Sequence, residues 1–255
     1  MEPGGAEEGR LRTLNLVAAS AHAAQAAAIL LLADGVSLPV TAEFLTGPPG
    51  AGDRGETELF ELPFGPAVAA FLLLAAVDHL AVAVGRGRRW YERNLAAEMN
   101  PARWWEYSVS ASLMVVLIAM LSGISEASAL IAIFGANAAM ILFGLVMERV
   151  NRPGEPVDWR PFAYGCVIGA FPWLAIGVTI GVAESEGGTV PGFVIAIFIS
   201  LLVLFFSFAA NMWLQYRRRG RWASYLHGER AYIWLSLTAK SALAWQVFAG
   251  VLAGG

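Results

Sequence analysis

Lysine and cysteine are almost absent from this chain of 255 residues. Lys240 is the one lysine, and every other positive charge, with histidine counted as neutral, is an arginine. The one cysteine, Cys166, lies in an apolar run and excludes an intramolecular disulfide. Charged residues make up only 15% of the chain, against 57% hydrophobic residues, and the mean hydropathy is +0.59. This composition excludes an ordinary soluble domain and predicts a membrane protein with several spans.

Seven apolar runs are each long enough to cross a bilayer as a helix. None alternates like a barrel strand, and backbone exposed to lipid must satisfy its own hydrogen bonds. We therefore predict an all-α membrane protein, with residues 1–255 forming a single seven-helix domain. The opening segment carries glutamates where a signal peptide would be basic, which predicts a retained first helix. The predicted spans are about 11–34, 66–85, 98–123, 126–148, 161–183, 191–216 and 229–253.

The arginines outside these spans concentrate in alternate loops. With seven spans, 14 positive charges fall on one side of the membrane and only Arg54 falls on the other. The positive-inside rule then predicts a multi-pass protein of the cell membrane with a cytoplasmic N-terminus and an extracellular C-terminus. The 14 are Arg10, Arg12, Arg86, Arg88, Arg89, Arg93, Arg149, Arg152, Arg160, Arg217, Arg218, Arg219, Arg221 and Arg230.

The longest loop, residues 35–65, joins the first two spans on the predicted outer side. Its segments PVTAEFLTG and ETELFELPFG alternate polar and apolar residues around the Gly/Pro-rich stretch GPPGAGDRG. This pattern predicts an extracellular β-hairpin. Two interpretations of the loop stay open: a cap or dimer contact, or simply a solvated loop.

Lys240 lies near the middle of the last span, where insertion of a lysine costs roughly 2.5 to 3.5 kcal/mol. One interpretation is an ion pair that holds the bundle together. The other is an amine used covalently, as in a Schiff base. We favour the second because arginine is the more usual structural cation.

Other ionisable residues within the spans are few, and such residues are functional candidates. Arg103 and Glu106 are three apart on one helix face, so the arginine is expected to hold the carboxylate in its ionised form. Ser236 lies one turn before Lys240, and Ser110 lies one turn beyond Glu106. The remaining candidates are His22, Asp78 and His79.

Seven spans, a lysine in the middle of the last, and Arg-x-x-Glu on the third resemble the microbial rhodopsin superfamily. In that superfamily the lysine binds retinal, and the carboxylate is the counterion of the protonated Schiff base. The predicted cytoplasmic N-terminus is similar to the heliorhodopsins, since ordinary members have it outside. Further matches are RWWEYSVSAS around Glu106, WLSLTAKSALAWQ around Lys240, His22, His79 and the hairpin loop.

The resemblance implies that Lys240 binds retinal, all-trans in the dark, with Glu106 as principal counterion because pumps have a second carboxylate where Ser236 stands. It implies that His22 and His79 belong to a polar cavity on the cytoplasmic side that handles the Schiff-base proton. The chromophore pocket is expected to include Ser110, Tyr107, Asn137, Met140, Ile141, Phe205 or Phe206, and Trp245, and the polar cavity Arg103, Gln25 and Gln246. Asp78 has no assigned role.

The function expected from this resemblance is light sensing without net ion transport. Beyond Lys240, toward the outside, no carboxylate or histidine occurs within a span until the boundary residues Asp34, Glu126 and Glu184. The alternatives are a light-driven or light-gated proton or ion transporter, and a transporter without retinal in which Lys240 and Glu106 form a substrate-coupled pair. We expect a homodimer in the lipid bilayer, with a cytoplasmic signalling partner and with no enzymatic activity, metal site or nucleic-acid partner.

Overall fold

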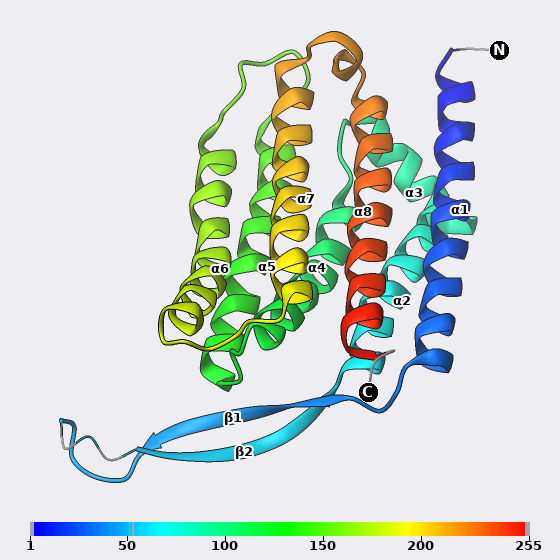
Figure 1. Cartoon of the computed structure of the whole chain (residues 1–255). Helices are drawn as coiled ribbons and strands as arrows, with labels where there is room; N and C mark the ends of the chain where they lie inside the picture. Colours follow the sequence, from blue (N-terminus) through cyan, green and yellow to red (C-terminus); the bar gives the residue numbers. More distant parts are fainter. Residues whose placement is uncertain (1–2, 51, 53, 253–255) are drawn as a thin grey trace.

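The computed structural model is a bundle of seven long helices with a short helix on its side (Figure 1). The structure describes residues 3–50, 52 and 54–252. The long helices are α1 (Pro3–Leu32), α2 (Phe64–Ala83), α4 (Pro101–Leu121), α5 (Ala127–Val150), α6 (Arg160–Ser185), α7 (Gly192–Arg217) and α8 (Tyr225–Val247). A 3-10 turn, Gly220–Ala223, precedes α8, and a π-helical turn, Phe248–Leu252, follows it.

These helices confirm the predicted all-α fold. The first helix begins eight residues before the predicted start at 11, and α8 begins four before the predicted 229. The predicted end of the last span, 253, lies outside the described residues. In the part of the chain that is described, six helices are long and apolar enough to cross a membrane. Of the seven long helices, α8 lies outside that set, because it carries Glu229, Arg230 and Lys240.

Most helices pack against their neighbours in the sequence. The contacts run from α1 to α2, α2 to α4, α4 to α5 and α5 to α6, and α8 packs against both α7 and α1. The two termini lie at opposite ends of the bundle (Figure 1). We call these ends the N-terminal end, where α1 begins, and the hairpin end, where α1 finishes. The largest hydrophobic core includes Ile29, Leu72, Ile118 and Leu243.

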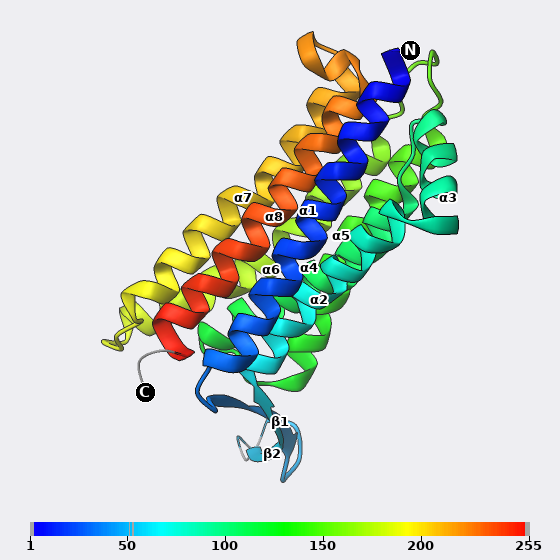
Figure 2. The same ribbon diagram turned by 90° about the vertical axis from the view of Figure 1, so that its right-hand side faces the viewer.

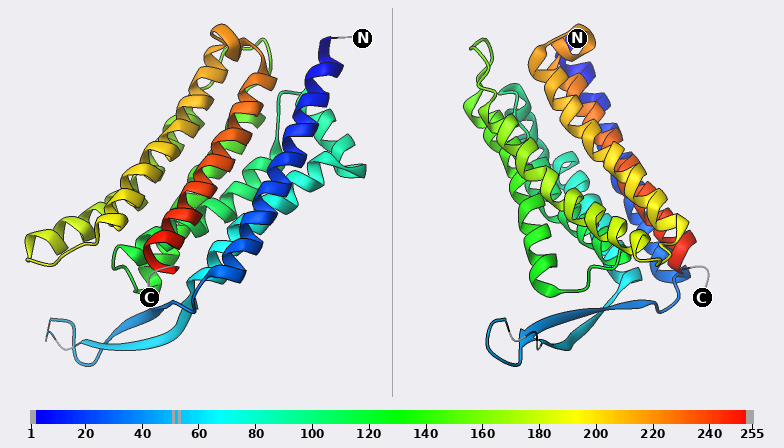
Figure 3. Two further views of the ribbon diagram at one scale, coloured as in Figure 1. Left: turned by 45° about the vertical axis from the view of Figure 1, so that its right-hand side comes forward. Right: turned by 60° about the vertical axis from the view of Figure 1, so that its left-hand side comes forward.

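The loop between α1 and α2 forms the predicted β-hairpin. Strands β1 (Ser37–Leu45) and β2 (Arg54–Pro63) pair antiparallel, from Ser37 opposite Pro63 to Leu45 opposite Arg54. The hairpin reaches sideways across the end of the bundle (Figure 3). It is held there by Thr41, whose backbone N–H donates to the Ser125 carbonyl at 2.9 Å.

A short helix, α3 (Gly85–Ala96), replaces the loop expected after the second span. Gly85, with φ of +55°, allows the sharp turn out of α2. Tyr91 and Leu95 are buried against the bundle, so packing stabilises a helix that charge content alone would not predict. The helix lies on the side of the bundle near the N-terminal end (Figure 2).

Candidate functional site

Lys240 lies in the interior of α8, where its amine contacts two polar side chains. Its Nζ donates hydrogen bonds to Ser236 Oγ at 3.0 Å and to Glu106 Oε2 at 3.1 Å, and Glu106 Oε1 also lies 3.1 Å away. The Lys240 and Glu106 side chains are only 3% and 6% exposed. The Tyr107 ring lies 4.8 Å from Nζ and gives a cation–π contact. A buried lysine charge is thus paired with a carboxylate from α4.

A cavity of about 620 Å³ lies beside this amine, between α4, α5, α6, α7 and α8. That volume falls within the roughly 300 to 1,000 Å³ of small-molecule sites. Lys240 and Ser236 supply polar groups to a wall that is otherwise largely apolar. Leu174 and Phe206 border the cavity and are more than half exposed, so it reaches the outer surface of the bundle between α6 and α7.

Most of the expected pocket residues border this cavity. They are Tyr107, Met140, Ile141, Phe205, Phe206, Ser236 and Lys240. Two others are fully buried nearby but absent from its lining: Ser110, and Asn137, which donates to Ser112 Oγ at 3.0 Å. Trp245 is 40% exposed and also lies off the lining.

Aromatic residues that the sequence did not single out form much of the cavity wall. Trp173 packs edge-on against Phe205, and Phe208 packs edge-on against Tyr107. Gly169 on α6 faces Met140 so closely that a Cβ there would collide with the Met140 sulfur. These residues come from α6 and α7, which are apolar along most of their length, so composition does not distinguish lining from lipid-facing positions.

His22 and His79 stack face to face between α1 and α2, with ring centroids 5.7 Å apart and planes 7° apart. Asn15 Nδ2 donates to the Leu11 carbonyl at 3.0 Å, which directs Asn15 Oδ1 toward His79 Nδ1, 2.7 Å away. Since an amide oxygen only accepts, His79 Nδ1 is the donor and its Nε2 is free to accept a proton. Both His22 nitrogens are buried without a partner among the described residues.

Asn15 was not among the residues singled out from the sequence, although it stands seven residues before His22 and therefore on the same helix face. The expected cavity residues Gln25 and Gln246 bond side chains other than the two histidines. Gln25 Oε1 accepts from Trp245 Nε1 at 3.1 Å, and Gln246 bonds Ser200 on α7 at 3.1 Å. The side chains of these two glutamines and of Trp245 thus bond one another or α7, and their expected places in the polar cavity and in the chromophore pocket stay predictions.

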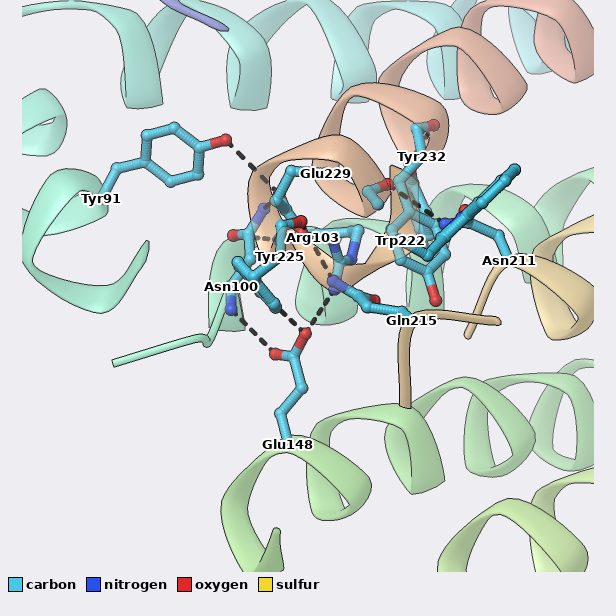
Figure 4. Close-up of polar contacts among 12 residues, drawn as sticks. Tyr91, Asn100, Arg103, Glu148, Asn211, Gln215, Trp222, Tyr225, Glu229 and Tyr232 are labelled. Atoms are coloured by element: carbon cyan, nitrogen blue, oxygen red, sulfur yellow. Dashed lines mark hydrogen bonds and ion pairs between the residues drawn. The ribbon is translucent and has the colours of Figure 1, made fainter. Parts of the chain in front are cut away.

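A second buried polar cluster lies toward the N-terminal end and is centred on Arg103 (Figure 4). Arg103 Nη2 lies 2.5 Å from Glu148 Oε1, and Nη1 pairs with Glu229 Oε1. All three side chains are at most 4% exposed. Asn100 donates to both glutamates, through its backbone N–H to Glu148 at 2.8 Å and through Nδ2 to Glu229 at 2.9 Å. The cluster therefore holds one positive and two negative charges.

Tyrosines complete the Arg103 cluster and join it to other elements. Tyr225 donates to Glu148 Oε1 at 3.0 Å, and Tyr91 on α3 donates to Glu229 Oε2 at 3.4 Å. The Arg103 guanidinium lies 3.9 Å from the Tyr232 ring centroid. The cluster thus joins α3, α4, α5 and α8.

The expected ion pair between Arg103 and Glu106 was wrong. Residues three apart share a helix face, but Arg103 extends toward α5 and α8, where Glu148 and Glu229 pair with it. The sequence did not identify these glutamates because they stand at the ends of predicted spans, where a charge can reach water. The one available indication was that these glutamates and Arg103, in the first turn of α4, all lie at the same end of their predicted spans.

Tyr107 connects the Lys240 pair with the Arg103 cluster. Its ring contacts Lys240, and its hydroxyl donates to the backbone carbonyl of Tyr232 at 3.1 Å. The ring of Tyr232 in turn lies against Arg103. A displacement of Lys240 can therefore reach the Arg103 cluster through two packed side chains, Tyr107 and Tyr232.

Among the described residues, no group of three His, Cys, Asp or Glu side chains could hold a metal ion.

Comparisons with known proteins agree with this architecture. The model of the family Heliorhodopsin matches residues 11–252. Among solved structures, the light-driven proton pump CsR of Coccomyxa subellipsoidea matches with a TM-score of 0.66 and 18% identity, over 94% of this chain and 96% of its own. The light-driven proton pump LR (Mac) of Leptosphaeria maculans matches with a TM-score of 0.61 and 17% identity, over 98% and 95%. No curated protein sequence matches significantly.

Proposed function

The chain belongs to the heliorhodopsin family of membrane photoreceptors, and we propose that it senses light through retinal held by Lys240, without net ion transport. We include in this proposal a single retinal-binding domain over residues 1–255 and an N-terminus in the cytoplasm. The observation that best supports the absence of net transport is the distribution of buried titratable side chains along the bundle.

The residues around Lys240 fit retinal. The cavity of about 620 Å³ has a largely apolar wall, which suits an elongated apolar molecule. Lys240, the one lysine of the chain, lines this cavity. When bound, retinal would supply light absorption and a change of shape on isomerisation. Trp173, Phe205 and Phe208 would hold the polyene in place, because their rings form a continuous aromatic wall.

Glu106 would stabilise a positive charge on the Lys240 nitrogen. Both of its oxygens lie 3.1 Å from Nζ, and it has no competing arginine because Arg103 binds other carboxylates. Ser236 Oγ, 3.0 Å away, adds a neutral acceptor. A nearby anion raises the proton affinity of a cationic nitrogen, so loss of the Glu106 charge would favour proton loss.

His22 and His79 would receive and return the proton that Lys240 loses after illumination. Their stacked rings are buried, and Asn15 leaves His79 Nε2 unprotonated and able to accept. The buried His22 nitrogens, which have no partner in the described chain, suit a second acceptor. The Arg103 cluster would then transmit the rearrangement to the cytoplasmic face, where a signalling partner would read it.

Buried titratable side chains argue against net transport, because none lies between Lys240 and the hairpin end in the described core. That region is filled by aliphatic residues such as Ile29, Leu72, Leu117 and Leu243. Apart from Glu106, which pairs with Lys240 itself, the buried histidines, glutamates and arginines belong to the histidine pair or to the Arg103 cluster. A proton released from Lys240 thus has titratable acceptors on one side of the bundle only.

Illumination of cells or liposomes that contain the retinal-loaded protein tests this proposal. We expect a coloured protein whose spectrum changes reversibly with light, with no sustained change in external pH. A sustained pH change abolished by a protonophore would instead establish the alternative, a light-driven proton transporter. Failure of the purified protein to become coloured with retinal would remove the photoreceptor proposal itself.

The homodimer is a separate part of the proposal and has its own test. The hairpin exposes Phe44, Leu45, Leu59 and Phe60, each more than half accessible, at the hairpin end. Such apolar side chains suit a contact with a second copy of the chain. Mass measurement of the detergent-solubilised protein would show a monomer after Phe44 and Phe60 are both replaced by serine, and an unchanged dimer would exclude this contact.

A further inference from the structure

Helix α3 has two faces of different chemistry. Tyr91 and Leu95 are buried against Leu11 of α1, Val82 of α2 and Ile233 of α8. At 100° per residue, the opposite face presents Arg86, Arg89, Trp90 and Arg93, and all four are exposed. The basic face of α3, defined by these four residues, therefore points away from the bundle.

The arginines of the basic face keep their charge unneutralised. Arg88 lies off this face and is paired with Glu92 at 2.5 Å. Within the described chain, Arg86, Arg89 and Arg93 form no ion pair with any acidic side chain. Three guanidinium groups in a row without an acidic partner suit an anionic ligand, because the Nη groups of each can donate hydrogen bonds to phosphate oxygens.

The depth of α3 indicates which anion it meets. Helix α2 has 20 residues, which at 1.5 Å per residue is about the 30 Å thickness of the hydrocarbon core. Since α3 begins two residues after α2 ends, it lies at the level of the lipid headgroups. Helix α1 extends about two turns beyond Leu11, its contact with α3, so α3 lies beside the bundle rather than beyond its end (Figure 2).

Trp90 supports the same placement. It is 39% exposed and stands between Arg89 and Arg93 on the basic face. Tryptophan is enriched at the membrane interface, where its apolar ring meets acyl chains and its N–H meets headgroups. A face exposed only to cytosol would gain nothing from this ring.

We propose that the basic face of α3 binds the phosphates of anionic phospholipids in the leaflet at the N-terminal end of the bundle. Arg86, Arg89 and Arg93 donate to the headgroups, and Trp90 inserts beside them. Tyr91 on the same helix donates a hydrogen bond to Glu229 of the Arg103 cluster, so α3 links the proposed lipid site to the buried polar residues. The proposal holds whether or not the protein senses light.

Native mass spectrometry of the detergent-solubilised protein with added phosphatidylglycerol or phosphatidylcholine tests the proposal. The wild type should bind phosphatidylglycerol more tightly. An arginine near an anionic surface contributes roughly a fivefold gain in affinity. Replacement of Arg86, Arg89 and Arg93 together by glutamine should therefore weaken phosphatidylglycerol binding at least about tenfold and leave phosphatidylcholine binding unchanged.

The matched control removes three other exposed arginines at the same end, Arg152, Arg219 and Arg221, and should keep phosphatidylglycerol binding within about twofold. Replacement of Arg86, Arg89 and Arg93 by lysine should restore much of the lost affinity, which separates charge loss from misfolding. Equal loss in the glutamine variant and the control would overturn the proposal. Unchanged phosphatidylglycerol affinity in the glutamine variant would also overturn the proposal. That result would be expected if the basic face of α3 binds an acidic soluble protein and not a lipid.

Discussion

The cost of a substitution in the Arg103 cluster should depend on the charges that the substitution leaves behind. Its one arginine faces two glutamates, all buried. Arg103→Gln would leave two carboxylates together without a cation, and breaking a buried pair in this way costs about 3 to 5 kcal/mol. Glu148→Gln would instead leave Arg103 and Glu229 as a balanced pair, so we expect a cost of about 1 kcal/mol, that of weakened hydrogen bonds.

The thermal midpoint of the purified protein measures this difference. For a protein of this size, 1 kcal/mol corresponds to about 2 to 4 °C, so Arg103→Gln should lower the midpoint by about 6 to 20 °C and Glu148→Gln by about 2 to 4 °C. The double variant Glu148→Gln and Glu229→Gln leaves the arginine unpaired and should resemble Arg103→Gln. If Glu148→Gln were as damaging as Arg103→Gln, the charge argument would be refuted.

Three further predictions concern the region around Lys240. Glu106→Gln should shift the absorption maximum to longer wavelength or leave the Lys240 nitrogen deprotonated, and an unchanged spectrum would exclude Glu106 as counterion. Gly144→Ala should lower the thermal midpoint, because the new Cβ would overlap the Trp104 ring and such overpacking costs about 1 to 3 kcal/mol. The control Gly135→Ala should leave the midpoint unchanged, because there is open space around that position. Asn15→Leu removes the acceptor of His79 Nδ1 and should change the recovery rate of the pigment after a flash, with the dark spectrum as control; identical recovery would exclude Asn15 from proton handling.

The sequence predicted those features that a bilayer makes obligatory. Long apolar runs can only be helices in lipid, so the seven spans followed directly from composition. The hairpin followed from the alternation of polar and apolar residues around a Gly/Pro-rich turn. By contrast, α3 was missed because its stability comes from Tyr91 and Leu95 packing on other helices, and a run of arginines by itself resembles a solvated loop.

Side-chain partners were less predictable than helices. Lys240 and Glu106 could be matched because both are rare charges at mid-membrane depth. The partner of Arg103 could not, because residues at spacing three share a face while a long arginine side chain reaches either of two neighbouring helices. Glu148 and Glu229 stand near helix ends, where hydropathy assigns a charge to water, and only the packing of α5 and α8 shows them to be buried.

Among the seven long helices, α8 falls short of the apolar character of a membrane span, and it is also the helix that carries Lys240; the two facts have one cause. Tyr232, Ser236 and Lys240 on α8, with Glu229 before them, follow one another at intervals of three to four residues and so share a face. That face meets Glu106, Tyr107 and Arg103 of α4, where each polar group finds a partner. A helix so lined is stable in a membrane only where other helices cover it, which is why α8 packs against both α7 and α1. Low hydropathy in the last long helix therefore indicates a polar site in the interior of the bundle.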